Sequence, residues 1–253
     1  MRALALAAAL AFTAAAQAQD PGVRGTRPGW PEPVSDSERF GFLLVDNLEW
    51  RGGDGPNGLA WDVQGWYGGD RSRIWLRSEG QRNERLRSGS EAEAELLYGR
   101  LVSPFFDLVG GIRYERKWER DASPDRTSLA IGVLGLAPYR FEVAPTLYLS
   151  QDGDASAKFS GSTDLLLTQR LILQPRLDAN AAFSEVERSG FRVAKGLNDA
   201  ELGVRLRYEI RRELAPYVGV SWKRSYGDTA DLLRRAGEDT RETRVFLGMR
   251  IWF

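Results

Sequence analysis

Apolar and polar residues alternate with a period of two along the last eleven residues of the chain, Thr243–Phe253. The odd positions from Val245 onward are all apolar, whereas the even positions include Arg244 and Arg250. This alternation is typical of a β-strand whose two faces meet different environments. A tilted strand of about ten residues is long enough to cross the apolar core of a bilayer. The pattern therefore predicts either a transmembrane strand or the final strand of a soluble sandwich.

The same alternation recurs from Phe40 onward, where turn residues separate segments of roughly ten residues. Pro175 lies inside one of these segments and cannot donate a ladder hydrogen bond, so we expect a bulge there or a later strand start. Asp228–Ala236 is expected to form one or two helical turns within a loop. Twelve segments are predicted as strands: 40–50, 58–67, 71–80, 91–100, 105–116, 126–135, 140–150, 156–167, 171–182, 199–210, 214–225 and 243–253.

The connections between the predicted strands alternate in length. Tight turns at 67–70, 102–104, 136–138, 168–170 and 211–213 alternate with a set of mostly longer polar loops, among them 81–90, 117–125, 183–198 and 226–242. Short turns at one rim and long loops at the other are typical of outer-membrane barrels, and an even strand number places both ends of the barrel at the short-turn rim.

Aromatic residues bracket the apolar face of these strands. Trp50 and Trp222 fall toward the long-loop rim, and Tyr98 and Tyr208 fall toward the short-turn rim, as interfacial anchoring requires. A final strand ending on an aromatic residue, here Phe253, also resembles the closing strand of bacterial outer-membrane barrels. These features favour the barrel over the sandwich. The predicted fold class is all-β: a transmembrane antiparallel β-barrel of about 12 strands over 39–253, with short periplasmic turns and longer extracellular loops.

The start of the chain predicts export. Met1 and Arg2 precede a short apolar run and the sequence Ala16-Gln17-Ala18, which is the pattern of a cleaved signal peptide at 1–18. Residues 19–38 are rich in proline, glycine and charge and lack periodicity, so we expect a flexible periplasmic arm. The expected location is the outer membrane, with its lipids as partners.

Composition restricts the chemistry. Lysine plus arginine and aspartate plus glutamate both number 35, and this balance gives no reason to expect nucleic acid as a partner. The sequence contains neither cysteine nor histidine. Thiolate and imidazole metal ligands and histidine-assisted nucleophiles are therefore excluded, and we predict that the protein is not an enzyme.

Charged residues on the polar face are candidates for function. Glu91, Glu93 and Glu95 follow one another at period two and are predicted to point inward together. One interpretation is a carboxylate-lined cation path or a metal site made of hard ligands. The other is an interior network of ion pairs with Arg77 and Arg113, which the mixture of acids and arginines favours. A filled lumen would exclude a wide general pore.

Several long motifs resemble the outer-membrane copper-resistance protein B family. They lie at 59–70, 168–176, 206–213, 215–222 and 227–230, and the resemblance covers about 40–253. It implies an outer-membrane barrel in copper homeostasis that binds copper ions, with periplasmic copper-handling proteins as candidate partners. Family members often carry a Met- and His-rich segment before the barrel, but 20–38 contains neither residue, so no metal motif is carried over. The alternative is a structural or narrow diffusion barrel with no copper site of its own.

Overall fold

The computed structural model describes residues 38–55, 57–84, 89–118, 123–188 and 191–253. The expected signal peptide at 1–18 and the arm up to residue 37 lie outside these residues. The described strands are β1 (Phe40–Gly53), β2 (Gly58–Gly68), β3 (Ser72–Asn83), β4 (Ser90–Ser103), β5 (Phe106–Trp118), β6 (Asp125–Ala137), β7 (Phe141–Val143), β8 (Thr146–Ser150), β9 (Ala155–Ser162), β10 (Leu165–Leu166), β11 (Leu171–Ala182), β12 (Val186–Arg188), β13 (Phe191–Val193), β14 (Gly196–Tyr208), β15 (Leu214–Ser225) and β16 (Arg241–Trp252).

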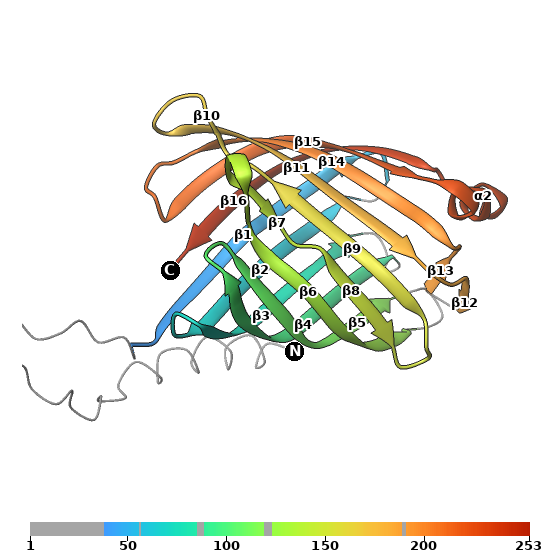
Figure 1. The fold of residues 1–253 in the computed structure, drawn as a ribbon. Coiled ribbons are helices and arrows are strands. Elements are labelled where there is room, and N and C mark those ends of the chain that lie inside the picture. Colours follow the sequence, from blue (N-terminus) through green and yellow to red (C-terminus); the bar gives the residue numbers. More distant parts are fainter. Residues whose placement is uncertain (1–37, 56, 85–88, 119–122, 189–190) are drawn as a thin grey trace, which may run out of the picture. The chain divides into compact units, whose positions relative to one another are not determined.

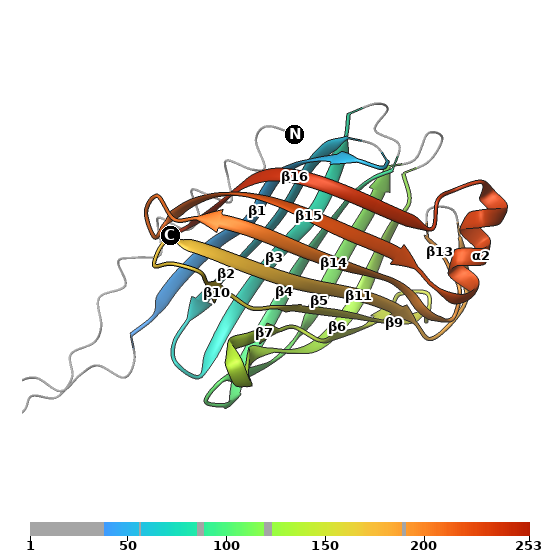
Figure 2. The same ribbon diagram turned by 90° about the horizontal axis from the view of Figure 1, so that it is seen from above.

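All strands except β12 and β13 form one antiparallel sheet that closes on itself (Figures 1 and 2). β16 pairs with β1, and β11 pairs with both β14 and β9. The sheet has 14 segments, but β7 with β8 and β9 with β10 are each one interrupted strand, which leaves a closed barrel of 12 strands. The barrel and the strand number predicted from the sequence are confirmed.

The expectation for Pro175 was wrong. β11 runs without a bulge through Pro175, which pairs with Val204, and its register shifts later, between Asn180 and Ala181. The irregularity lies instead in the neighbouring strand, where two residues separate the end of β9 at Ser162 from the start of β10 at Leu165. Because proline has no N–H to donate, one hydrogen bond is missing between β11 and the neighbouring strand. The neighbouring strand is interrupted at this point, whereas β11 continues.

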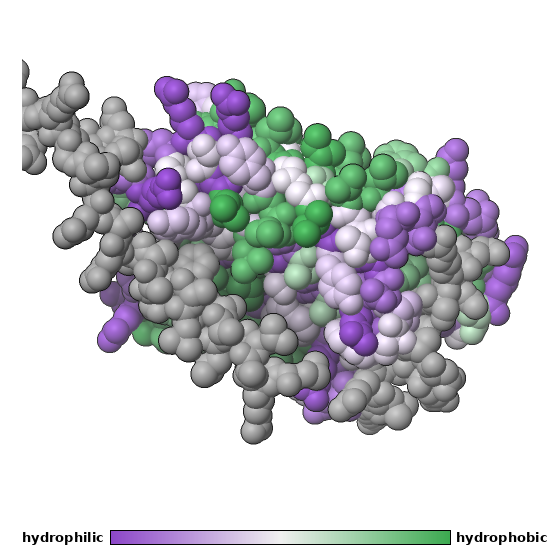
Figure 3. Space-filling model, turned by 90° about the horizontal axis from the view of Figure 1, so that it is seen from below, coloured by the Kyte–Doolittle hydropathy of each residue, from purple (hydrophilic) through white to green (hydrophobic). Residues whose placement is uncertain are grey.

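The outer face of the barrel is apolar. Leu129, Val245 and Leu247 are each more than 60% exposed, which in water would be an unfavourable patch but suits a face in contact with hydrocarbon. Figure 3 shows hydrophobic residues gathered across the middle of one wall and hydrophilic residues toward both ends. The rings of Trp222 and Tyr208 are also exposed, as expected for residues that anchor the two membrane interfaces.

The two rims differ in the way the loop lengths predicted. The helix α2 (Gly227–Ala236) and the β12–β13 hairpin lie at one end of the barrel. The C-terminus lies at the opposite end (Figure 1). α2 confirms the helical turns expected near 228–236, whereas the hairpin was not predicted. Thr229 of α2 accepts a hydrogen bond from the backbone of Ala194, so the helix is fixed to the loop that contains the hairpin. None of the described helices is both long and apolar enough to span a membrane.

Phe253 closes the barrel at the short-turn rim. Its N–H donates to the carbonyl of Leu43 at 2.9 Å, and its carbonyl accepts from the N–H of Leu43 at 3.1 Å. Deleting Phe253 removes both bonds, each worth about 1 kcal/mol, from the seam between β16 and β1. We expect a smaller assembled fraction in outer-membrane extracts, measured by heat-modifiable migration in gels. Phe253→Leu keeps the backbone pair and is the control; equal assembly of the deletion variant would contradict this role.

The inner face changes character along the barrel. Toward the short-turn rim it carries a buried apolar cluster of Leu97, Val109, Ala130, Leu134 and Tyr148, with Trp75 packed against it. Toward the long-loop rim it is charged. The face that carries the predicted charged residues therefore also carries apolar ones, since Leu97 follows Glu95 on the same face of β4.

Candidate functional site

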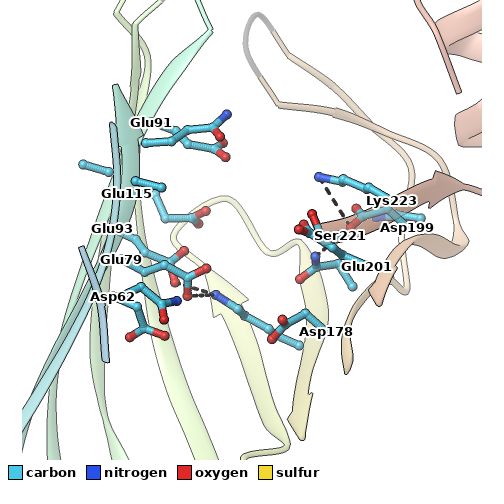
Figure 4. A pocket seen from close by; sticks show the side chains of 18 of the residues that line it. Asp62, Glu79, Glu91, Glu93, Glu115, Asp178, Asp199, Glu201, Ser221 and Lys223 are labelled. Atoms are coloured by element: carbon cyan, nitrogen blue, oxygen red, sulfur yellow. Dashed lines mark hydrogen bonds and ion pairs between the residues drawn. The ribbon is translucent and has the colours of Figure 1, made fainter. Parts of the chain in front are cut away.

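A cavity of about 370 Å³ occupies the charged half of the lumen. Its lining reaches from Lys117 and Glu242 near the long-loop rim to Asp62, Lys158 and Arg176 further inside. Figure 4 shows five acidic residues of its lining on one wall: Glu91, Glu115, Glu93, Glu79 and Asp62. Asp199, Glu201, Ser221 and Lys223 lie on the facing wall.

The three carboxylates singled out in the sequence all lie on the inner side of β4, but in different surroundings. Glu91 is 48% exposed by side chain, and its carboxylate is 3.5 Å from the ammonium of Lys117. Glu95 is buried, accepts a hydrogen bond of 2.6 Å from the hydroxyl of Tyr148 and lies 3.2 Å from Arg77. The row is therefore graded from an accessible acid near the rim to an enclosed one.

Glu93 stands between these two and has two cationic partners. It accepts hydrogen bonds from the guanidinium of Arg113 and, at 2.8 Å, from the ammonium of Lys158. The interior ion-pair network that the sequence favoured is thus present. Its members keep the buried carboxylates compensated, since an unpaired charge in such a place is costly.

A second acidic row runs across the strands and was not found from the sequence. Asp62 of β2 lies directly opposite Glu79 of β3, Glu79 lies opposite Glu93 of β4, and Glu93 lies opposite Glu115 of β5. Like charges in directly opposed positions destabilise a sheet. Four acids in one such row therefore require cations held nearby.

Basic side chains supply that compensation from two directions. Arg113 and Arg126 lie on the same wall, and both donate to Glu115, at 2.8 and 2.9 Å. Lys158 donates to Glu79 at 2.7 Å, and Arg176 donates to Asp62 at 2.9 Å. These last two residues belong to β9 and β11, on a different part of the barrel wall from the acids.

Besides the two acidic rows, a cluster of charged and aromatic side chains surrounds Glu49, which is 1% exposed. Its carboxylate accepts hydrogen bonds from Arg51 at 2.6 Å and from the Tyr217 hydroxyl at 2.7 Å. The guanidinium of Arg205 is within 4.0 Å of Glu49 and stacks over the rings of Tyr217 and Phe246, at 5.5 and 5.6 Å. Each cluster member is thus held by charge or by cation–π attraction.

Two glycines make room for these rings. A Cβ on Gly248 would lie 2.6 Å from the Tyr217 ring, and a Cβ on Gly219 would lie 2.3 Å from the ring of Phe246. Both glycines are the cross-strand partners of the rings that cover them. The glycines therefore leave room for the two aromatic side chains, which meet edge to face at an interplanar angle of 78°.

A bulge in β1 adds one further acid to the lumen. The register of β1 shifts between Val45 and Asn47. As a result Asp46 and Asn47, although consecutive, both turn inward, a common use of bulges. Asp46 lies 3.0 Å from Arg250 and 3.5 Å from both Arg176 and Arg205.

The lumen atoms that could coordinate a metal ion are oxygen atoms. Met249, the methionine that remains beyond the expected signal peptide, is exposed on the outer face, and the sequence has no cysteine or histidine. Within the described residues no three acidic side chains are grouped as a metal-binding set. Carboxylates suit hard ions and bind Cu(II) better than Cu(I), which prefers thiolate and thioether sulfur.

Comparisons with known proteins agree on one family. A family model described as Copper resistance protein B precursor (CopB) matches residues 39–253. Copper resistance protein B of Escherichia coli is 46% identical over 220 residues, which are 87% of this chain and 72% of that protein. A Copper resistance protein B homolog of Pseudomonas syringae pv. tomato (strain ATCC BAA-871 / DC3000) is 40% identical, with the same coverage.

Among solved structures, the chain is similar to a NanC porin, with a TM-score of 0.52 and 11% sequence identity. The likeness covers 83% of this chain and 98% of the porin. At this identity the similarity concerns the fold alone: an outer-membrane type of barrel.

Proposed function

The chain belongs to the copper resistance protein B family, and from this premise we propose that it takes part in copper homeostasis as a barrel of the outer membrane. One observation carries the proposal: the family match spans 39–253, which is the whole barrel with its charged lumen. We propose that the long loops face the outside and that periplasmic copper-handling proteins meet the short-turn rim. The role is non-enzymatic.

The proposal extends to copper as the ion handled by the lumen. We assign Glu91, Glu93 and Glu95 as candidate contacts for Cu(II) and exclude them for Cu(I), because their oxygen donors are hard. Alternate residues of a strand are about 6.6 Å apart, so a single ion would contact at most two of the three at once. Glu91 is the first contact, since Glu93 and Glu95 are held by Lys158, Arg113 and Arg77.

A second candidate function is a structural or narrow barrel with no copper site of its own. The observation that favours it is the pairing of the same acids. Glu93 and Glu95 each have basic or hydroxyl partners within hydrogen-bond distance, and an ion would have to displace them. The two functions differ in whether the purified barrel retains copper.

Equilibrium dialysis of the purified protein against Cu(II) and Cu(I) separates these functions. If the carboxylate row contacts the ion, Glu91→Gln is expected to weaken Cu(II) binding several-fold with unchanged assembly, because Glu91 is half exposed and its removal strands no buried charge. Glu93→Gln should lower assembly as well. Glu84→Gln, an exposed acid just after β3, is the matched control.

Two outcomes would count against the assignment. Unchanged Cu(II) binding in Glu91→Gln would remove Glu91 as a contact, and no copper retained by the parent protein would favour the barrel without a site. Tight Cu(I) binding would mean that the soft ligands come from a partner, since this chain offers Met249 on its outer face.

A further inference from the structure

We infer that Lys158 and Arg176 close the lumen by crossing it, and that their removal opens a path selective for small cations. The inference concerns ion permeation and does not depend on copper. It rests on four contacts between opposite parts of the barrel wall, on the place where the cavity ends, and on the row of acids that the two cations cover.

Lys158 bridges strands that are not neighbours. Its ammonium is 2.7 Å from Glu79 on β3 and 2.8 Å from Glu93 on β4. Going round the sheet, β5, β6 and β8 separate β4 from β9, which carries Lys158. The side chain therefore spans the lumen instead of following the wall, and it is 11% exposed.

Arg176 makes the same crossing from the adjacent strand. It extends from β11 to Asp62 on β2 at 2.9 Å and to Asp46 on β1 at 3.5 Å. Between β11 and β1 the sheet contains β14, β15 and β16. Asp178, next but one on β11, accepts from the Arg176 Nε at 2.8 Å and fixes the direction of the guanidinium.

The two crossings lie at the inner end of the cavity. The cavity is lined by Asp62, Lys158 and Arg176, but its described lining does not include Gln64, Trp66 or Arg250 on the inner face beyond them. Below this level the apolar cluster around Leu97 begins. The cavity is thus a vestibule that opens toward the long loops and ends at the two cations.

The acids that Lys158 and Arg176 cover determine which ions would pass through the lumen if these two side chains were shortened. The opposed row described above consists of Asp62, Glu79, Glu93 and Glu115. Lys158 and Arg176 form ion pairs with three of these four carboxylates. Rows of carboxylates in a narrow pore attract cations and repel anions. With the two basic side chains shortened, the exposed row should give the pore cation selectivity.

Conductance of the full mature protein in planar bilayers tests the inference. The parent barrel should conduct weakly, and Lys158→Ser with Arg176→Ser should conduct several-fold more, with a reversal potential that shows preference for K⁺ over Cl⁻. Lys223→Ser is the matched control, because Lys223 lies in the same cavity but pairs with Asp199 of the adjacent strand at 3.7 Å. It should leave conductance at the parent level.

The double variant leaves carboxylates without partners and can fail to assemble, so a second variant is needed. Adding Asp62→Asn and Glu93→Gln lowers that repulsion and should give an open pore with reduced cation preference. Assembly of every variant is checked by heat-modifiable migration. A parent barrel that conducts as well as the opened variants, or an assembled second variant that stays closed, would overturn the inference.

Discussion

Glu49→Ala is expected to lower the free energy of unfolding of the barrel by about 3–5 kcal/mol, the usual cost of removing one partner from a buried ion pair. The loss is large because Arg51 would lose its carboxylate at 2.6 Å and be left with Glu201 at 3.8 Å, and Arg205 would be left with Asp46 at 3.5 Å. The Tyr217 hydroxyl would lose its acceptor as well. Urea unfolding of the purified barrel in lipid vesicles, followed by tryptophan fluorescence, measures the change.

Two comparisons separate lost charge from lost packing. Tyr217→Phe removes the hydroxyl but keeps the ring over Gly248, and should cost about 1.5–3 kcal/mol, as for a hydrogen bond to a charged group. Glu213→Ala removes an exposed acid and should change little. If Glu49→Ala were no less stable than Glu213→Ala, the cluster would not contribute to stability.

The strands could be predicted because their signal is local. Alternation along Thr243–Phe253 predicts β16, observed at Arg241–Trp252, without knowledge of any neighbour. The membrane-facing side follows from the same pattern, since a lipid-exposed wall selects apolar residues at every second position. A helical turn near 228–236 was likewise visible in the sequence.

Features that depend on the neighbouring strand were predicted poorly. The effect of Pro175 appears as the interruption between β9 and β10 on the adjacent strand. No proline or glycine in the sequence indicates the bulge at Asp46 and Asn47, although this bulge turns the Asp46 carboxylate into the lumen. Both depend on which residue of the partner strand lies opposite, which one chain segment does not specify.

The candidate site shows the same division. Glu91, Glu93 and Glu95 were found because they follow one strand, whereas the row from Asp62 to Glu115 appears only when four strands are set in register. The cross-lumen contacts of Lys158 and Arg176 need the closed barrel itself. Lumen contacts therefore have to be read from the assembled sheet.

Because the acidic row runs across the strands, substitution of Arg113 should destabilise the barrel more than substitution of any other basic residue of its wall. Its guanidinium donates to Glu93 and, at 2.8 Å, to Glu115, and lies 4.3 Å from the ring centre of Tyr148. Arg113→Met keeps much of the volume but removes the charge between two opposed carboxylates. We expect a loss of about 3–5 kcal/mol in the free energy of unfolding, measured in the same vesicles.

Rescue distinguishes repulsion within the row from a general packing defect. Glu93→Gln alone leaves Arg113 with Glu115 and should destabilise the barrel. In the Arg113→Met background the same substitution removes one of the two opposed carboxylates, while Glu115 keeps Arg126 and Lys158 keeps its contact with Glu79. The double variant should therefore be more stable than Arg113→Met, with a coupling energy of about 1–3 kcal/mol for residues in one network. Losses that simply add would show that Arg113 acts by packing, and that the opposed acids do not repel one another in the folded barrel.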